Sequence, residues 1–557
     1  FALVYETVVD FWHSETSCFE EGRVGRLKLL PKKGDPSDPS NWRGIMLLDV
    51  SAKVVASIIS ARLERVLADE GVEYQNGFLR QRGCSDGIFS LKLALLKRKE
   101  HGLNTWALYV DLVKAFDSVD RKLMLDILRR FGVPEHLIHL VHLLHKDVTV
   151  RMAVGKIEVE FGSSVGVKQG DTLAPILFLF VIQAAMETLE PIFEEHGIEK
   201  PAFRTADDDV IVGRKVDEEG ETFHLWASLY ADDAGLPFTS RADLELGTRL
   251  LKQHLERFGL VMHCGTMKPD GTPAKKSKTE AMFYPAAGYT PTDNDTLPLR
   301  VDDHHGIVTF TDQFRYLGAI ISSSLTDDAE ITNRIRSAAA AFGSLQRWVF
   351  GQSFGSKSLP LSSKGKLYGS LVLGILLYGC ESWVLTQPLL QRLHTFHNGC
   401  VRSMTGRAAR VPDGEHARRR ALAPLYSALG LTSIDKYISN RKLRWAGHVM
   451  RMDMSRLPRK FMTAWVDVPR ERGRPVHSYG HDLARELNSI GFNLDRRAVG
   501  IGASQSWGEA AQNRELWREL SCTIMQTKPI SDQAPAVQPR ATNWSHRLRS
   551  RMVGGAP

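Results

Sequence analysis

The feature of this sequence that most constrains its fold is an apolar run that ends in a carboxylate. Residues 105–112 (TWALYVDL) are apolar and β-favouring up to Asp111, which predicts a buried central strand. A carboxylate that closes a buried strand is costly unless it is paired or bound to a metal. Further along, Asp232 and Asp233 lie between two β-like runs, residues 223–230 and 235–239. We therefore expect a sheet on which carboxylates from separate strands converge.

These three carboxylates suit phosphoryl transfer to a growing nucleotide chain. Such a reaction mainly requires a protein to position its substrates and to offset developing negative charge. The usual arrangement is two Mg²⁺ ions about 3.5–4 Å apart, and Mg²⁺ prefers hard oxygen ligands. Each aspartate taken alone is as readily a turn or capping residue. The assignment therefore depends on the segments around them.

The flanking segments predict an α+β chain. Gly155-Lys156 separates two strand-like runs, residues 149–154 and 157–161, and predicts a hairpin. Helical patterns are found in residues 45–67, in a segment capped by Ser118 and stopped by Gly132, and in an apolar segment from Thr172. Residues 194–221 are polar and acidic and predict an exposed insertion. Its run Asp207-Asp208-Asp209 has no strand-like left flank, so we expect a solvated loop there.

Composition narrows the class of protein only slightly. The chain has 557 residues, a net charge of +8 and a pI of about 9.0. This excess of positive charge suits a polyanionic partner but does not identify one. The six cysteines form no CxxC pair, which favours free thiols in a reducing compartment. No signal peptide and no apolar run of about 18 residues is apparent, so no membrane association is expected.

Two further features have ordinary explanations. Cys380, His394, His397 and Cys400 are residue types that bind zinc, but three of them lie in one expected helix, which favours helix packing over a metal site. The chain starts at Phe1 within an amphipathic pattern and without an initiator Met. We expect a fragment or a processed product.

Three motifs occur in a characteristic order. They are residues 111–117 (DLVKAFD), 166–175 (GVKQGDTLAP) and 230–233 (YADD). Their order and spacing resemble the palm of reverse transcriptases, and specifically those of non-LTR (LINE-like) retrotransposons. The resemblance implies that Asp111 and Asp232 ligate Mg²⁺, with Mn²⁺ as a possible substitute, and that Asp233 lies close by or also ligates.

The same resemblance assigns residues around the incoming nucleotide. It places Gln169 and Gly170 under the nucleotide and the template base, where a glycine allows close backbone approach. Phe116 would lie beneath the sugar and clash with a 2′-hydroxyl, so the product should be DNA; the alternative is a plain core residue. Lys278, in residues 277–280 (SKTE), would approach the leaving pyrophosphate.

Motifs on either side of the palm extend the resemblance. Residues 30–35 (LPKKGD) and 41–48 (NWRGIMLL) resemble the fingers motif, with Lys32 and Arg43 toward the template and primer. Residues 75–86 resemble the family's Gly-Phe-Arg-x-x-Arg segment, in which Arg82 would hold the triphosphate. Leu79 departs from the pattern, because the family has an arginine there. Tyr316-Leu317-Gly318 resembles the primer grip.

Together these segments predict a right-hand polymerase. We expect an N-terminal extension and fingers in 1–104, a palm with an antiparallel sheet in 105–310, and the primer grip with a helical thumb in 311–420. A helical basic region in 421–522, where Arg and aromatic residues alternate in a way that suits RNA binding, precedes a Pro-, Gln- and Ser-rich, disordered tail in 523–557.

The expected function is RNA-directed DNA polymerisation that copies retrotransposon RNA. The partners would be an RNA template, a DNA primer or target DNA, and dNTPs, within a nuclear or cytoplasmic ribonucleoprotein. The endonuclease that nicks target DNA would come from missing sequence or another protein. Two alternatives stay open: a group II intron maturase-like reverse transcriptase, and a domesticated or inactive copy that binds nucleic acid without catalysis.

Overall fold

The fold was examined in a computed structural model of the chain. It describes residues 2–13, 24–32, 34–214, 218–268, 273–302, 306–350, 359–406, 410–413, 416–469, 478–492 and 506–526. The predicted tail from residue 523 lies outside these ranges except for its first four residues.

An eight-stranded sheet organises the chain. Its central strand, β3 (Thr105–Val110), is buried along its whole length and pairs antiparallel with β9 (Asp233–Phe238) and β12 (Glu280–Tyr284). The order is β11-β10-β14-β12-β3-β9-β8, and β13 pairs with β14. The remaining strands are β8 (Ser228–Tyr230), β10 (Gly265–Met267), β11 (Pro273–Lys275), β13 (Leu299–Arg300) and β14 (Gly306–Phe310).

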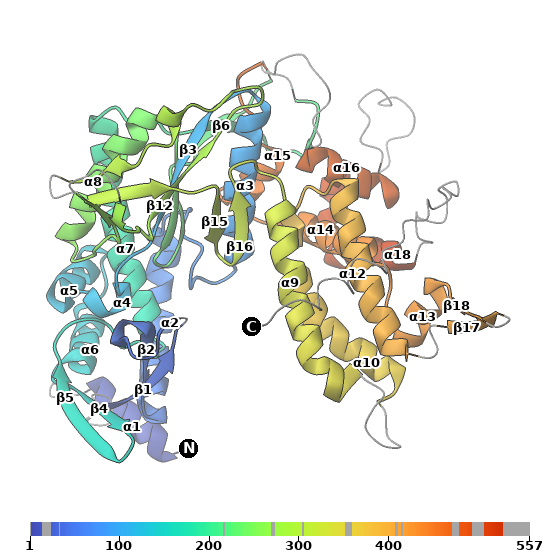
Figure 1. Cartoon of the computed structure of the whole chain (residues 1–557). Coiled ribbons are helices and arrows are strands. Elements are labelled where there is room, and N and C mark those ends of the chain that lie inside the picture. Colours follow the sequence, from blue (N-terminus) through green and yellow to red (C-terminus); the bar gives the residue numbers. More distant parts are fainter. Residues whose placement is uncertain are drawn as a thin grey trace, which may run out of the picture.

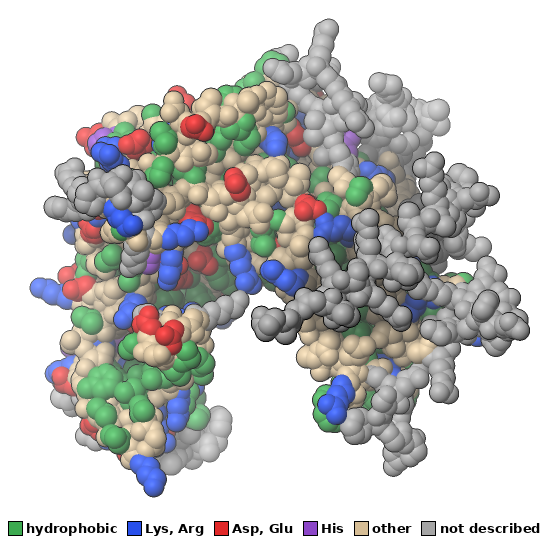
Figure 2. Space-filling view, in the orientation of Figure 1, with side chains coloured by type: hydrophobic (Ala, Val, Ile, Leu, Met, Phe, Trp, Pro, Cys, Tyr) green, Lys and Arg blue, Asp and Glu red, His purple; other side chains and the backbone are tan. Residues whose placement is uncertain are grey.

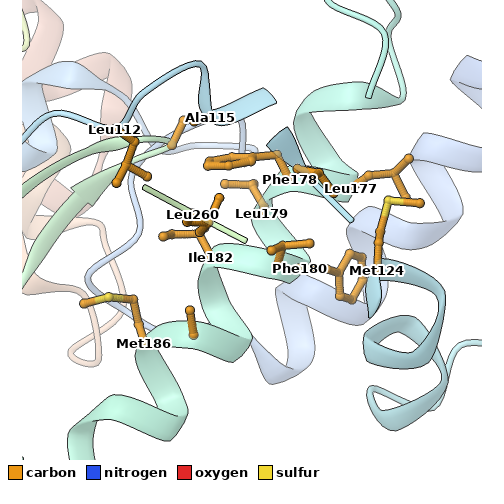
Figure 3. Packing of buried hydrophobic residues seen from close by; sticks show 14 of the residues in the cluster. Leu112, Ala115, Met124, Leu177, Phe178, Leu179, Phe180, Ile182, Met186 and Leu260 are labelled. Carbon is orange, nitrogen blue, oxygen red and sulfur yellow. The ribbon is translucent and has the colours of Figure 1, made fainter. Parts of the chain in front are cut away.

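Helices cover both faces of this sheet, which explains why β3 is apolar at every position. Trp106, Leu108 and Val110 belong to one core, and Ala107 and Tyr109 belong to another, because successive strand residues point to opposite faces. The first core is closed by α2 (Val50–Glu70), α5 (Arg121–Arg130), α6 (Glu135–His145), α7 (Ala174–Glu195) and α8 (Arg241–Arg257). Figure 3 shows Leu112 and Ala115 beside Phe178 and Leu179 of α7 in this core.

Helix α7 is the one described helix that is long and apolar enough to cross a membrane. It is also the central helix of the first core, and 67% of its apolar stretch is buried inside the protein. A buried core helix meets the same criteria of length and composition, so the structure itself accounts for the apolar character of α7.

The second core joins the sheet to the C-terminal helices. Helix α3 (Cys84–Glu100) packs there with Phe203, Met282, Leu443, Phe461 and Trp517, which are all buried. The helices that supply the last three residues and their neighbours are α14 (Ile434–Met450), α15 (Leu457–Thr463), α16 (Tyr479–Ser489), α17 (Trp507–Gln512) and α18 (Arg514–Gln526). The far face of the sheet is therefore covered by α3, which directly precedes β3, together with helices from residue 434 onward.

Two arms extend from this body and give the molecule the shape of an arch (Figure 1). One arm is a second sheet, of order β2-β1-β4-β5, with strands β1 (Val24–Pro31), β2 (Trp42–Leu47), β4 (Val148–Val154) and β5 (Ile157–Ser163); α1 (Ala2–His13) packs against α2 nearby. The other arm is helical and has its own core, with α9 (Asp328–Leu345), α10 (Leu361–Tyr368), α12 (Gln387–Thr405) and α13 (Leu422–Leu429). Figure 2 shows the open space between the arms, with Lys and Arg side chains along its upper edge.

Strand β5 forms one edge of the small sheet and is exposed for nearly all of its length. Ile157, Val159 and Phe161 are 68%, 45% and 43% exposed. The predicted hairpin at Gly155-Lys156 is confirmed, because Val154 pairs with Ile157 across a two-residue turn.

Two local predictions were wrong. Residues 45–47 lie in β2 and not in a helix, and α2 begins only at Val50, after the Asp49 cap. Helix α5 is capped by Asp120, whose side chain accepts from the Leu123 amide, whereas Ser118 ends the separate short helix α4 (Ala115–Ser118). In both places an aspartate directly before the helix, Asp49 or Asp120, forms the cap.

Part of the expected exposed insertion packs into the second core. Residues 202–205 and 221–224 form a hairpin, β6 (Ala202–Thr205) with β7 (Glu221–His224). Phe203 and Phe223 pack edge-to-face on Phe461, at 5.0 and 5.1 Å between ring centroids. Arg204 and Trp465 exchange both backbone hydrogen bonds. A few apolar side chains thus anchor a segment whose overall composition is polar.

The aspartate run in this segment is a loop with Asp207 exposed, as predicted, but its aspartates bind partners that the prediction did not include. Asp207 pairs with the buried Arg459 (3.1 Å), and Asp208 pairs with Arg214. Asp209 accepts hydrogen bonds from the Gly508 amide (3.1 Å) and, at its carbonyl, from the Trp507 indole (2.7 Å). The partners of Asp207 and Asp209 lie about 250–300 positions away in the chain, so local sequence could not reveal them.

Candidate active site

The register of β3 and β9 brings the predicted carboxylates together. Val110 pairs with Ala234, so one step further places Asp111 opposite Asp233. Tyr230 pairs with Asp233 across β8 and β9, which leaves Ala231 and Asp232 as the two residues of the turn. The carboxylates therefore come from the ends of adjacent strands, as expected.

Their electrostatics confirm that the three groups interact. Burial, the charge of Asp232 and the charge of Asp111 together raise the pKa of Asp233 to about 6. Burial and the charge of Asp111 also raise the pKa of Asp232, while Arg43 on β2 opposes this shift. A bound cation would offset the repulsion between these like charges.

The donor set fits Mg²⁺ by type, although the carboxylates do not converge on a single point. Among the described residues no group of three or more His, Cys, Asp or Glu side chains is placed to hold one ion. Mg²⁺ needs fewer protein ligands than that, because it is usually held by one or two carboxylates together with water and substrate phosphates. Asp111, Asp232 and Asp233 meet this requirement as hard, negatively charged and mutually repelling oxygens.

Asp111 is positioned by the segment that carries Lys278. The Asp111 amide donates to the buried Thr279 hydroxyl (3.2 Å), and the Asp111 carbonyl accepts from the His263 amide (2.8 Å). The Lys278 amide donates to the His263 ring at Nδ1 (3.2 Å), and the Lys278 side chain is exposed. Lys278 thus lies next in sequence to Thr279, the residue that contacts the Asp111 backbone, and its predicted role at the pyrophosphate stays a prediction.

The turn at Asp232 depends on a residue that sequence reasoning did not single out. The buried Gln75 side chain accepts at Oε1 from the amides of Ala231 (3.0 Å) and Gly77 (2.8 Å). Ala231 adopts a φ of 54°, which is uncommon for a residue with a Cβ, and the hydrogen bond stabilises it there. Gln75 lies in the Gly-Phe-Arg-like segment, so that motif was the available signal.

Arg82, predicted to hold a triphosphate, is bound to protein groups instead. It donates to the carbonyls of Glu73 (2.7 Å) and Gln75 (3.0 Å) and pairs with the Glu73 carboxylate (2.9 Å). Arg456 pairs with the same carboxylate (3.0 Å). In this arrangement Arg82 stabilises the segment that carries Gln75 and so supports the turn at Asp232. Leu79, at the departure from the family pattern, packs against the first core.

The predicted nucleotide platform is adjacent to β2. The Met46 amide donates to the Gln169 carbonyl (2.7 Å). Gly170 has a φ of 112°, and a Cβ there would lie 2.6 Å from the Met46 carbonyl oxygen, so its close neighbour is protein backbone and only glycine fits. Phe116 is half-buried and stacks on Phe178 at 4.7 Å, which combines a core contact with an exposed edge.

The remaining predicted contacts divide between surface and interior. Lys32 and Arg43 are exposed on β1–β2. Tyr316 is buried and donates to the Ser228 carbonyl (2.8 Å). Leu317 and Gly318 form the turn between β15 (Gln313–Tyr316) and β16 (Ala319–Ser322), with φ of 47° and 85°. This turn is held by Tyr378, whose hydroxyl donates to the Leu317 carbonyl (2.7 Å).

The helix that carries the zinc-type residues uses them in packing. The fully buried His397 contacts the Tyr368 hydroxyl at Nδ1 (2.9 Å) and the Thr432 carbonyl at Nε2 (2.8 Å). His394 approaches Asp435 at 3.4 Å, and Cys380 and Cys400 are buried.

The sheet is antiparallel around the carboxylates, as predicted, although β12 and β14 pair in parallel. Such a sheet, with acidic side chains at the ends of adjacent strands and between a strand-rich and a helical arm, defines a palm-type nucleotidyltransferase fold. Residues 30–321 match the family described as reverse transcriptase (RNA-dependent DNA polymerase). This is more than half of the chain, and the chain belongs to that family. Its similarity to retrotransposon Pol proteins confirms the resemblance to the non-LTR branch.

Named relatives come from mobile elements. The chain is 30% identical over 168 residues to the Drosophila melanogaster "Retrovirus-related Pol polyprotein from type-2 retrotransposable element R2DM", covering 30% of this chain and 16% of that protein. It is 22% identical over 391 residues to the "Probable RNA-directed DNA polymerase from transposon X-element" of the same species, covering 69% and 38%. The chain thus spans well under half the length of these relatives.

Solved structures with a similar arrangement include a telomerase from Candida tropicalis. The alignment covers 90% of this chain and 64% of the telomerase, with 10% identity and a TM-score of 0.40.

Proposed function

We propose that this chain copies RNA into DNA by metal-dependent nucleotidyl transfer. The observation that carries the proposal is the strand register that sets Asp111 opposite Asp233, with Asp232 at the adjoining turn. Membership of the reverse transcriptase family supports the same reaction. The RNA template, the DNA primer or target and the dNTPs are the partners that this function requires.

In the proposed mechanism, the residues of this chain orient the reactants and offset charge. Asp111, Asp232 and Asp233 would hold two Mg²⁺ ions, or Mn²⁺, which supply electrostatic stabilisation of the attacking 3′-oxygen and the triphosphate. Thr279 and His263 fix the backbone of Asp111, and Gln75 fixes the turn. The exposed Lys278 side chain, on the segment that contacts the Asp111 backbone, would offset the negative charge of the leaving pyrophosphate and donate a proton to it.

The test is extension of a DNA primer on an RNA template with dNTPs and Mg²⁺. The chain should extend the primer, and Asp232→Asn/Asp233→Asn should reduce the rate by at least about 10³-fold, since these groups act together on the charge of the transition state. A matched control is Asp126→Asn/Asp293→Asn, which removes two exposed carboxylates elsewhere. Equal rates for the two double variants would refute the assignment. Binding of primer and template without extension by the parent would instead support a non-catalytic copy.

Phe116 is proposed to select against the ribose 2′-hydroxyl. Its stacking on Phe178 holds the ring in a fixed plane. Phe116→Ala should raise the use of rNTPs relative to dNTPs by about tenfold or more, which is the size of discrimination that a steric pocket supplies. Unchanged discrimination would leave Phe116 as a core residue only.

The remaining partners follow from the kind of element proposed. Nicking of target DNA would come from another part of a longer polyprotein or from another protein. The chain would work inside a ribonucleoprotein in the nucleus or cytoplasm.

A further inference from the structure

A basic site, separate from the proposed catalytic carboxylates, lies on the C-terminal helices. These helices contribute none of the proposed catalytic residues. It is a cavity of about 670 Å³ between α14, α18 and the turn at Glu381. Five arginines line it: Arg441, Arg444, Arg451, Arg514 and Arg518. Its volume falls within the range of sites that enclose a small ligand or a short strand segment.

Helix geometry places these arginines in two facing rows. Arg441, Arg444 and Arg451, together with His448, follow steps of three and four along α14, so they share one face. Arg514 and Arg518 are four residues apart on α18, which packs directly against α14. The tight approach of the two helices depends on Gly447, where a Cβ would lie 2.0 Å from the Trp517 indole nitrogen.

The charge in this cavity is not balanced by the protein. Within the described parts of the chain, none of the five arginines has an ion pair with a carboxylate, and Glu381 is the one acidic residue of the lining. Several arginines nearby and elsewhere are paired with carboxylates, such as Arg456 with Glu73, Arg459 with Asp207 and Arg334 with Glu330. Like charges at this spacing destabilise a helix. An external polyanion would remove that cost.

The lining also supplies an aromatic surface. Trp445 is half-buried, lies edge-on to Phe89 at 5.5 Å, and its indole N–H has no hydrogen-bond partner among the described residues. His448 lies beside it at 5.6 Å between ring centroids. Arginines that contact phosphates combined with an aromatic ring that stacks a base are the recurrent means of binding single-stranded nucleic acid.

We infer that the cavity between α14 and α18 binds a single strand of nucleic acid, through its phosphates at the five arginines and a base or sugar at Trp445. The inference rests on the proposed function only in that a reverse transcriptase meets single strands of both RNA and DNA. The site would hold template or product strand away from the carboxylates.

Arg444 and Arg518 give the sharpest test, because both side chains are exposed and neither makes a described hydrogen bond. Binding of fluorescent unstructured 12-nucleotide RNA and DNA strands is measured by anisotropy over a salt series, without Mg²⁺ or dNTPs. Arg444→Ala/Arg518→Ala should bind about tenfold more weakly, and its slope of log K against log salt should be shallower by about 1.4, from about 0.7 for each lost phosphate contact. The strand that shows the larger loss is the natural occupant.

Two further variants separate the site from total charge and from folding. Arg130→Ala/Arg300→Ala removes two exposed arginines elsewhere and should keep the parent affinity and slope. Arg444→Lys/Arg518→Lys should keep the salt slope while losing part of the affinity, because lysine cannot form the bidentate contact. Equal loss in the two alanine variants overturns the inference. Since nothing is polymerised in this measurement, its outcome is independent of whether the chain extends primers.

Discussion

At the scale of single residues, the buried side-chain amide of Gln75 supports the turn at Asp232. Gln75 Oε1 satisfies two backbone N–H groups, one from Ala231 in the turn and one from Gly77. Without it, both donors would be buried without partners, and such a loss costs about 1–3 kcal/mol for each group. The position of Asp232 thus depends on a residue that touches no substrate.

Gln75→Leu should therefore lower both stability and activity. We expect a loss of about 2–4 kcal/mol in the free energy of unfolding and a fall in kcat with little change in KM for dNTP. Gln75→Glu keeps the acceptor and should recover most of the kcat. Urea unfolding and steady-state extension check the two effects. An unchanged kcat in a folded Gln75→Leu would show that the turn does not need this support.

His397 should make the helical arm sensitive to acid. Burial lowers the pKa of His397 to about 4, below the ordinary value of about 6.5. The neutral ring is therefore favoured in the folded state, and its contribution to stability is complete above pH 6.5 and is lost as the pH falls below it. Between pH 7.5 and 5.5 this amounts to about 1.4 kcal/mol.

The comparison is between the parent and His397→Gln, with the exposed His196→Gln as control. The drop in unfolding free energy from pH 7.5 to 5.5 should be smaller in His397→Gln by about 1.4 kcal/mol, whatever its absolute stability. A drop equal to that of the parent would mean that another group carries the acid sensitivity.

At the scale of elements, the loop before α7 depends on one glycine. Gly170 combines a φ of 112° with a 2.6 Å approach to the Met46 carbonyl. Gly170→Ala should cost about 2–4 kcal/mol, from backbone strain and from the contact that must open. Gly155→Ala is the control, since Gly155 has a φ of 64° but open space around its Cβ position, and it should cost about 1 kcal/mol.

Thermal unfolding measures this pair of variants. If Gly170→Ala loses no more stability than Gly155→Ala, β2 must move away from the added methyl group at little cost.

The elements that could be predicted are those whose structure is determined by residues close by in the sequence. β3, the hairpin at Gly155-Lys156 and α7 follow from apolar runs and turn residues, and the site aspartates from strand ends. Asp120, Gln75 and the Asp207–Asp209 run could not be assigned, because their roles depend on competing caps or on partners far away in sequence. Residues 45–47 were misassigned because a strand and a helix there share an apolar pattern.

At the scale of the whole molecule, the palm and the C-terminal helices share one core. Phe203 and Phe223 contact Phe461, while Tyr109 and Phe89 belong to the same cluster as Trp507 and Trp517. A cluster of this kind links residues from β3 to α18, so the two regions should unfold together.

A chain that ends at residue 420 should consequently lose its tertiary structure. It would expose the palm residues of the second core and leave Glu73 with Arg82 as its one remaining described ion-pair partner. We expect no cooperative thermal transition in near-UV circular dichroism. A chain that ends at residue 526 keeps that core and should unfold as the parent does. A cooperative transition in the shorter chain would show that the palm folds independently.

The exposed edge of the small sheet bears on how this protein behaves at high concentration. Strand β5 presents Ile157, Val159 and Phe161 beside unpaired backbone groups, and such an edge can template pairing with a second molecule. Glu158 and Glu160 alternate with these apolar residues, and Arg151 binds Glu160 at 2.8 Å. Charges of this kind discourage strand-to-strand aggregation. Glu158 and Glu160 should therefore limit aggregation at an edge whose other side chains are apolar and exposed.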